Sequence, residues 1–227
     1  MKINPKVIDI YHLNANNAHG GDAADFHAAF AFGIRGVIHK AMQVTADRLY
    51  PIRRHKAIDA GMLWGAYHFN TGESAQVQAK RFLDFAEPDR STVCALDWED
   101  ENGVRHMHLQ TARAFVEYVD EALEKLGQKP DSCVLYSGNV VKEEIAKADD
   151  ETRAFFGAHR LWLAQYAAQP IMLDYNHHPL PWKSPWIWQY TGDAVGPQPH
   201  NIPGIGHGVD INSVDGTDDQ LKAQWIA

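Results

Sequence analysis

The sequence contains few cysteines: Cys94 and Cys133 are the only two among 227 residues. A disulfide framework needs more cysteines than this, which excludes the class of small secreted domains held together by several bridges. Each cysteine opens an apolar stretch, and we expect both to be small core residues. A single bridge between neighbouring strands is the alternative.

Long hydrophobic runs and an excess of basic residues are also missing. No apolar run approaches the 18 residues of a transmembrane helix, so no stable membrane insertion is expected. The first six residues lack the apolar core of a signal peptide. The 21 Lys and Arg are outnumbered by 29 Asp and Glu, which gives a net charge of -8. Because phosphate binding needs a basic field, nucleic acid is not expected as a partner.

The chain shows no internal repeat, low-complexity tract or linker, and we expect residues 1–227 to form one domain. Its 13 histidines include His106 and His108, which have the look of a metal-binding pair. A zinc site needs three or four well-spaced ligands with supporting partners, and no such set is visible. The sequence therefore predicts no metal site and no cofactor.

Apolar, strand-like runs recur along the chain, and segments of helical character separate the first five. Eight such runs cover residues 7–13, 36–42, 62–69, 92–99, 132–139, 160–167, 185–191 and 208–214. Helices are expected at 22–32, 51–60, 74–86 and 108–126. The last is the clearest, because one apolar stripe repeats at helical spacing through Leu109, Ala112, Val116, Val119, Leu123 and Leu126.

This alternation predicts an α/β fold, either a barrel or a doubly wound sheet. The first five strands read as continuous apolar runs, as in a parallel sheet that is covered on both faces. Residues 170–208 are rich in Pro, Gly, Trp and His, so loops are expected to join the later strands. We therefore expect a distorted barrel of about five βα units followed by three strands with little helix.

The sequence Asp97-Trp98-Glu99 stands at the downstream end of the fourth apolar run. Because side chains alternate across a strand, Asp97 and Glu99 should point one way, within roughly 7 Å of each other at their stems, and Trp98 the other. Glycoside hydrolysis needs a pair of acids: one protonates the leaving oxygen, and the second meets the positive charge that grows at the sugar carbon.

Other polar and aromatic residues stand at the ends of the remaining runs. In barrels of this kind, active residues cluster at the carboxyl ends of the strands. Asp9 and Asp210 would bring two further acids to the same edge. We take eight more residues as candidate substrate contacts, since sugars stack on aromatic faces and bond to polar groups. They are Lys40, Tyr67, Phe69, Tyr136, Trp162, Gln165, Trp188 and Gln189.

The chain resembles glycoside hydrolase family 25, the N-acetylmuramidase-type lysozymes, over nearly its whole length. The resemblance rests on an ordered series of short pieces at residues 7–10, 36–41, 65–69, 78–83, 96–99, 161–166, 188–190 and 209–212. Each piece alone is weak, but their order and gaps together are specific. The family's fold is a flattened, TIM-like (β/α)₅β₃ barrel, in agreement with the strand count.

The resemblance implies a bacteriolytic enzyme that cleaves the β-1,4 bond from N-acetylmuramic acid to N-acetylglucosamine in peptidoglycan, with retention. It assigns the general acid to Glu99, and family acids match Asp9, Asp97 and Asp210. Two departures concern substrate subsites. Gln43 stands where many members carry an acid, and residues 11–14 replace a more common run of Ser and Trp.

Two mechanisms remain open for Asp97. It could attack the sugar carbon directly, or it could orient the 2-acetamido group of the substrate, which then attacks; we favour the second, since the substrate always carries that group. The pKa of Glu99 is expected to be raised by neighbouring carboxylates and partial burial. Asp9 and Asp210 are expected to tune the site electrostatically and to hydrogen-bond the sugar.

Two rival functions are weighed against this one. A chitinase-like enzyme of family 18 would need acids at positions 92 and 95, where Thr92 and Ala95 stand. A catalytically silent barrel that only binds wall sugars or a partner protein is the other rival, and the intact acids argue against it. A glycosidase of another N-acetylhexosamine polymer is a related alternative.

Peptidoglycan glycan strands are the expected partner, and the protein is expected to be a monomer that acts outside the cytoplasm on the cell wall. Export by phage lysis or by a secretion system would fit the absence of a visible signal peptide. The sequence does not distinguish an endolysin from a wall-remodelling enzyme or a secreted toxin. It also leaves open any inhibitor or immunity protein and the acetylation or peptide preference of the substrate.

Overall fold

A computed structural model describes residues 1–16, 21–100, 103 and 105–226, and it has eight strands closed into a barrel. Around the barrel the strand order is β1-β10-β7-β6-β5-β4-β3-β2. Neighbouring strands are parallel except for β10, which runs antiparallel to both β1 and β7. The barrel strands are β1 (Pro5–Ile10), β2 (Gly36–Met42), β3 (Leu63–Phe69), β4 (Val93–Asp97), β5 (Val134–Ser137), β6 (Leu161–Ala164), β7 (Ile187–Thr191) and β10 (Asp210–Val214).

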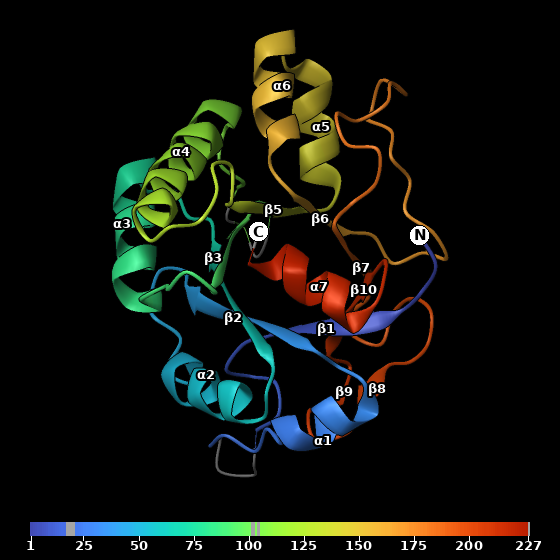
Figure 1. The fold of residues 1–227 in the computed structure, drawn as a ribbon. Helices are drawn as coiled ribbons and strands as arrows, with labels where there is room; N and C mark the ends of the chain where they lie inside the picture. Colours follow the sequence, from blue (N-terminus) through green and yellow to red (C-terminus); the bar gives the residue numbers. More distant parts are fainter. Residues whose placement is uncertain (17–20, 101–102, 104, 227) are drawn as a thin grey trace.

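Helices surround the barrel, and a seventh helix crosses one end of it (Figure 1). A short hairpin of β8 (Asn201–Ile202) and β9 (Gly206–His207) precedes the last barrel strand. No helix in the described part of the chain is long and apolar enough to span a membrane. The helices are α1 (Phe26–Phe32), α2 (Tyr50–Asp59), α3 (Ala75–Ala86), α4 (Leu109–Lys125), α5 (Asn139–Lys147), α6 (Asp150–Ala158) and α7 (Asp218–Trp225).

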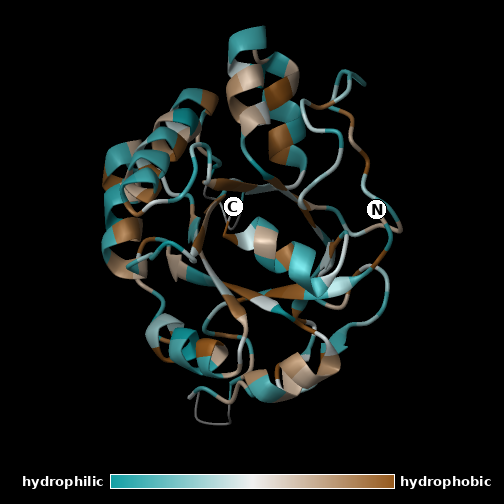
Figure 2. Ribbon diagram, viewed as in Figure 1, coloured by the Kyte–Doolittle hydropathy of each residue, from teal (hydrophilic) through white to brown (hydrophobic). Residues whose placement is uncertain are grey.

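Two apolar clusters follow from the alternation of side chains along the strands. The larger cluster fills the space between the outer faces of the strands and the helices, and Trp98 belongs to it. The smaller cluster fills the barrel interior, from Trp162 and Tyr136 to Leu221 and Trp225 of α7. Figure 2 shows hydrophobic residues along the strands and mixed hydrophobic and hydrophilic residues along the helices. The barrel is thus a packed core and not a pore.

Helix α7 closes the amino-terminal end of the barrel. The indole Nε1 of Trp225 donates to the carbonyl of Trp64 at 2.9 Å. Asp218, at the start of the helix, pairs with Lys6 and Arg35, with N–O distances of 2.6 Å to each. The opposite end of the barrel, where the parallel strands finish, has no such helix among the described residues and remains open to a ligand.

The predicted α/β barrel is confirmed: all eight apolar runs contain barrel strands, and all four expected helices are present. The prediction was wrong in placing Glu99 within the fourth strand, because β4 ends at Asp97. The helices α6 and α7 and the hairpin β8–β9 were not predicted, and the helix of the fifth βα unit, α5, was expected without bounds. Cys94 and Cys133 are free and buried, as expected for small core residues.

Candidate active site

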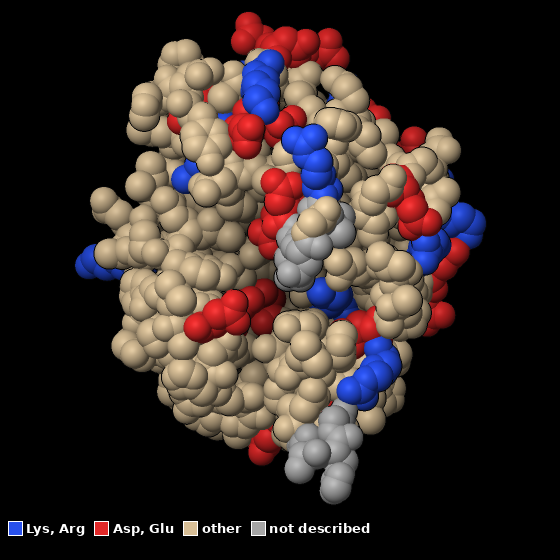
Figure 3. Space-filling view, turned by 180° about the vertical axis from the view of Figure 1, so that it is seen from behind, with Lys and Arg blue, Asp and Glu red and all other residues tan. Residues whose placement is uncertain are grey.

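A cavity of about 390 Å³ opens at the carboxyl ends of the barrel strands. Figure 3 shows this face, opposite to the view of Figure 1, with acidic side chains gathered near a central hollow. Five carboxylates line the cavity: Asp9, Asp97, Glu99, Asp193 and Asp210. The other lining residues are Tyr11, His12, Leu13, Lys40, Gln43, Tyr67, Phe69, Tyr136, Trp162 and Tyr166.

Asp9 is held by amide groups from two other strands. Gln189 Nε2 donates to both of its carboxylate oxygens, at 3.2 and 3.1 Å, and Asn212 Nδ2 donates to Oδ2 at 2.7 Å. Tyr136 and Trp162 extend this network by donating to Gln189 Oε1 at 2.9 Å and to Asn212 Oδ1 at 2.6 Å. The network fixes the Asp9 carboxylate inside the barrel and favours its charged form.

Asp210 faces Asp9 across the antiparallel pair of β1 and β10. Burial raises the pKa of Asp9 to about 6, against the opposing effect of the amide hydrogen bonds. Burial, together with the charges of Asp9 and Asp193, raises the pKa of Asp210 to about 9. At neutral pH, Asp210 therefore carries a proton that it donates toward the ionised Asp9, as in other close carboxyl pairs.

Gly192 allows the loop after β7 to approach Asp210. A Cβ atom at this position would overlap the hydroxyl of Tyr166 and lie 2.5 Å from Asp210 Oδ1. The next residue, Asp193, has a positive φ of 49° and is exposed at the cavity. The absence of a side chain at Gly192 therefore lets Tyr166 and Asp210 meet beneath this turn.

Asp97, the last residue of β4, and Glu99, two residues beyond it, both line the cavity. Asn70 links to both, because its backbone N–H donates to the carbonyl of Asp97 at 3.1 Å and its Oδ1 accepts from the backbone N–H of Glu99 at 3.1 Å. Between them, Trp98 is fully buried and stacks on Phe156, with ring centroids 5.4 Å apart. The predicted division, with Asp97 and Glu99 on one side and Trp98 on the other, is confirmed.

Lys40 is a basic residue among the carboxylates of the cavity. Its Nζ lies 4.8 Å from the ring centroid of Tyr11, 5.5 Å from that of Phe69 and 5.9 Å from that of Tyr67. The same Nζ donates to Gln43 Oε1 at 3.3 Å. Aromatic rings and one cation therefore form the wall contributed by β1, β2 and β3.

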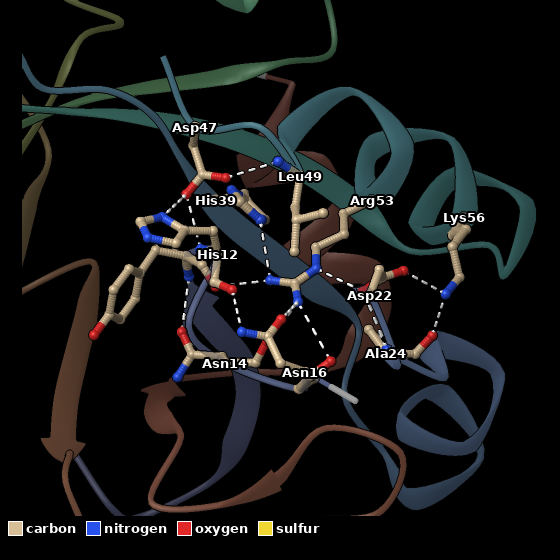
Figure 4. A network of polar contacts seen from close by, with 12 residues as sticks. His12, Asn14, Asn16, Asp22, Ala24, His39, Asp47, Leu49, Arg53 and Lys56 are labelled. Atoms are coloured by element: carbon tan, nitrogen blue, oxygen red, sulfur yellow. Dashed lines mark hydrogen bonds and ion pairs between the residues drawn. The ribbon is translucent and has the colours of Figure 1, made fainter. Parts of the chain in front are cut away.

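Arg53 of α2 is fully buried and holds the segment that follows β1 (Figure 4). Its guanidinium donates to the carbonyls of Tyr11 and Asn14 and pairs with Asp22, with an Nε–Oδ1 distance of 2.8 Å. On the same segment, His12 Nδ1 lies 3.0 Å from Asp47 Oδ2. These contacts fix His12 at the edge of the cavity.

The structure brings nine of the twelve predicted site residues to the cavity wall. Gln189 lies behind the wall, where it holds Asp9, and Gln165 lines an adjoining depression. The substrate contact expected of Trp188 is not supported by its position, because its side chain is fully buried in the outer cluster and donates to the carbonyl of Gln165. Alternation explains this, since Ile187 and Gln189 point into the barrel.

Sequence reasoning missed Asp193, and it placed Tyr11, His12, Leu13, Gln43 and Tyr166 near the site without choosing them. Leu13, Gln43 and Asp193 lie on loops beyond the strand ends, where no periodic pattern marks an inward direction. A signal did exist for Tyr166, which follows β6 by two residues.

Within the described ranges, Asp120, Asp131 and His159 could approach a metal ion, since one ligand atom from each lies within 4.8 Å of the others. His159 Nε2 already lies 2.8 Å from Asp120 Oδ2, and hydrogen bonds to Asp120 raise the pKa of His159 despite burial. The Nε2 atom of His159 is therefore already engaged by a carboxylate of the same group. His106 instead lies against Asp100 and Glu144.

The family model for Glycosyl hydrolases family 25 matches residues 8–198. Among solved structures, the bacterial lysozyme from Streptomyces coelicolor superposes with a TM-score of 0.75 and 18% identity, covering 100% of this chain and 98% of that one. A muramidase from Acremonium alcalophilum gives a TM-score of 0.72 and 22% identity, covering 98% of each chain. At these identities the likeness shows the fold.

A curated relative is the Uncharacterized protein YegX of Escherichia coli O157:H7, which is 28% identical over 171 residues. The matched region covers 72% of this chain and 52% of that protein. The chain therefore spans about half the length of this relative.

Proposed function

The chain belongs to glycosyl hydrolase family 25 and is a glycoside hydrolase, and from this premise we propose that it is a lysozyme. Its substrate would be peptidoglycan, cleaved with retention at the β-1,4 bond between N-acetylmuramic acid and N-acetylglucosamine. The observation that carries the proposal is that Asp9, Asp97, Glu99 and Asp210 line one sugar-sized cavity at the open end of the barrel. Among the neighbours of similar fold are a lysozyme and muramidases.

Glu99 is proposed as the general acid and base. It would protonate the glycosidic oxygen as the bond to the sugar carbon breaks, and it would later accept a proton from the attacking water. Its half-buried position at the cavity wall supports this role, because it keeps the carboxyl within reach of both substrate and solvent.

Asp97 is proposed to orient and polarise the 2-acetamido group of the substrate, whose oxygen then attacks the sugar carbon. Direct attack by Asp97 is the alternative. Mass spectrometry separates the two, because a glycosyl-aspartate adduct on Asp97 would contradict acetamido participation.

Asp9 and Asp210 are proposed to act as a pair. The ionised Asp9 would stabilise positive charge on the sugar ring, as preorganised groups do for a developing charge. The protonated Asp210 would provide an O–H donor and limit the negative charge of the site. The hydrogen bonds from Gln189 and Asn212 to Asp9 support this division.

Enzyme and substrate would meet outside the cytoplasm, at the cell wall, with the protein acting as a monomer. Lys40, Tyr67, Phe69, Tyr136 and Trp162 are proposed as substrate contacts, since their side chains line the cavity.

The test is mass spectrometry of the fragments released from purified peptidoglycan. Reducing ends on N-acetylmuramic acid are expected, whereas reducing ends on N-acetylglucosamine would contradict the proposed bond. The Glu99→Gln variant should be slower by about 10²- to 10⁴-fold, the usual contribution of a general acid. Unchanged circular dichroism serves as the control for its fold. Release at the wild-type rate by Glu99→Gln would contradict the role of Glu99.

A further inference from the structure

A separate cavity, of about 300 Å³, lies at the end of the barrel opposite to the catalytic cavity. Residues just before β6 and β7, the residue just after β10 and helix α7 line it. Because β10 runs antiparallel to its neighbours, it ends on the side where β6 and β7 begin. The two cavities share no lining residue among those described, so this space stands apart from the proposed chemistry.

Arg160 stands immediately before β6 and brings a positive charge to this cavity. Its Nη1 donates to the carbonyl of Gln224 at 2.6 Å, and its Nη2 donates to the carbonyl of Ser132 at 3.2 Å. A guanidinium has more N–H groups than these two bonds use, and the others, Nε–H among them, have no acceptor in the described part of the chain. Burial lowers the pKa of Arg160 to about 10, which still leaves the group charged at neutral pH.

Asp215 brings a negative charge to the same cavity, yet it does not pair with Arg160. Among the residues that the structure describes, neither side chain takes part in an ion pair. The charge of Asp120 also acts on Arg160, but its carboxylate already lies 2.8 Å from His159 Nε2. A buried charge without a partner costs free energy, which a ligand of opposite charge recovers. Two opposite charges that line one small space without meeting therefore suit a ligand that carries both.

Two indole rings supply the apolar part of the wall. Trp186 Nε1 donates to Gln224 Oε1 at 3.1 Å, and Trp182 Nε1 donates to the carbonyl of His159 at 2.7 Å. The guanidinium carbon of Arg160 lies 4.1 Å from the ring centroid of Trp186, which holds the cation in place. Because both indole N–H groups are bonded to the protein, a ligand meets the rings only as apolar surface, which suits methylene groups.

We propose that this cavity, here called the basal pocket and lined by Arg160, Trp182, Trp186, Asp215 and Gln224, binds a peptide stem of peptidoglycan through the side-chain end of a diaminopimelate residue. That end carries one carboxylate and one ammonium group on a chain of methylenes. The carboxylate would meet Arg160, the ammonium would meet Asp215, and the methylenes would lie on the indole rings. This inference rests on the proposed function and deepens it, because it names the wall chemistry that the protein recognises outside its catalytic cavity.

The basal pocket would give the protein a second point of attachment to the wall. Two linked contacts hold a polymer more tightly than either contact alone. A protein that releases a cleaved strand at the mouth of the barrel would stay attached through the opposite end. Peptide stems built with lysine lack the side-chain carboxylate, so the pocket would favour walls built with diaminopimelate.

The test measures binding of two tripeptides to the full chain by isothermal titration calorimetry. The first is L-alanyl-γ-D-glutamyl-meso-diaminopimelate, and the second is L-alanyl-γ-D-glutamyl-L-lysine. The two ligands differ by one carboxylate, on the carbon that carries the side-chain amine. The first should bind at millimolar concentration and about tenfold or more tightly than the second, as expected for a hydrogen bond between charged groups.

Two variants separate the two ends of the ligand. Arg160→Gln should weaken binding of the diaminopimelate peptide about 10- to 100-fold and binding of the lysine peptide less than about threefold. Asp215→Asn should weaken both peptides about three- to tenfold, because both carry the side-chain amine. Lys183→Gln and Asp219→Asn remove the same charges at exposed positions outside the pocket and should each change binding by less than about twofold.

Equal binding of the two tripeptides by the wild type, or no binding at millimolar concentration, overturns the proposal. Tighter binding of glycerol phosphate than of the diaminopimelate peptide also overturns it, in favour of a phosphate site. If circular dichroism shows that Arg160→Gln is unfolded, the comparison of the two peptides and the exposed Asp215→Asn variant decide, and unchanged binding by Asp215→Asn contradicts the proposal.

Release of muropeptides by the wild type, measured separately, distinguishes this inference from the proposed function. If release occurs and the peptide pattern fails, only the assignment of the basal pocket is wrong. If the peptide pattern holds and release fails, the basal pocket is supported and the proposed cleavage is wrong.

Discussion

Because of the pair of Asp9 and Asp210, the folded protein binds more protons than the unfolded chain does. Burial raises the pKa of Asp9 to about 6 and that of Asp210 to about 9, from 3.8 for an ordinary aspartate. A carboxyl whose pKa is higher in the folded state than in the unfolded state stabilises the folded state. This stabilisation is complete at pH values below the pKa of the unfolded state. That contribution is lost as pH rises through the folded pKa. The pair should therefore lower the free energy of unfolding progressively between about pH 4 and pH 9.

Asp210→Asn should remove most of this pH dependence, because an amide does not titrate and can still donate to Asp9. Near pH 4 the variant and the wild type should have similar free energies of unfolding. At pH 9 the variant should be more stable by about 1 to 3 kcal/mol, since one unit of pKa corresponds to about 1.4 kcal/mol. Urea unfolding at pH 4, 6 and 9 measures the difference. Asp84→Asn, which changes an exposed carboxyl, is the control.

Parallel curves for wild type and Asp210→Asn between pH 4 and pH 9 would contradict this account of the pair.

The sequence predicted the four acids well and the sugar contacts less well. Asp9 and Asp97 stand at the ends of continuous apolar runs and Asp210 stands in the last run, and the alternation of side chains along any strand puts Glu99 on the same side as Asp97. Asp193 lies on a turn after β7, where nothing in the local sequence predicts that it approaches the cavity. Trp188 shows the opposite error. It was predicted as a substrate contact because it is an aromatic residue near a strand end, but its side chain lies on the outer face of the barrel.

At the scale of elements, the described segment that directly follows β1 is held by Arg53. This side chain is fully buried, pairs with Asp22 and donates to the carbonyls of Tyr11 and Asn14. It stands in place of the regular hydrogen bonds that an irregular segment cannot make. A distant helix residue thus positions the cavity wall that carries Tyr11 and His12.

Arg53→Met should therefore lower the free energy of unfolding by about 3 to 5 kcal/mol, because it removes one partner from a buried charged network. Arg54→Met, on the same helix, should cost about 1 kcal/mol or less, since Arg54 pairs with a largely exposed Asp89. Urea unfolding of the two variants provides the comparison. Equal losses for both variants would show that Arg53 does not organise the segment.

The barrel strands were predictable because both faces of the sheet are covered. Each strand in such a sheet is a continuous apolar run, which stands out in the sequence. The bounds of α5 and the presence of α6 were missed because each helix has only nine residues and only two residues separate them. Sequence signals were present all the same. Asp149 caps α6 through the backbone N–H of Thr152, and Thr217 and Gln220 form a capping box at the start of α7.

At the scale of the whole molecule, α7 completes the interior core from below. Trp225 and Leu221 belong to the same apolar cluster as Tyr136 and Trp162, whose upper faces line the cavity. The barrel interior therefore has an apolar floor and a polar mouth. Stability is concentrated at one end and chemistry at the other, as in other barrels.

Trp225→Ala should lower the free energy of unfolding by about 3 to 5 kcal/mol, as is usual when a large buried aromatic is removed. Its rate of peptidoglycan cleavage at temperatures where it stays folded should remain within about twofold of wild type. Thermal unfolding and turbidity loss measure the two effects. Lys222→Ala, at an exposed position of the same helix, is the control and should change neither.

A large loss of cleavage in folded Trp225→Ala would mean that the floor of the barrel shapes the cavity more directly than its position indicates.

The position of α7 also determines how the protein can be attached to a support. The helix lies across the end of the barrel opposite to the carboxylates, so a linker joined beyond Trp225 leaves on the face away from the catalytic cavity. A preparation immobilised on a bead or a sensor through that end would present its catalytic cavity to a suspension of cell walls.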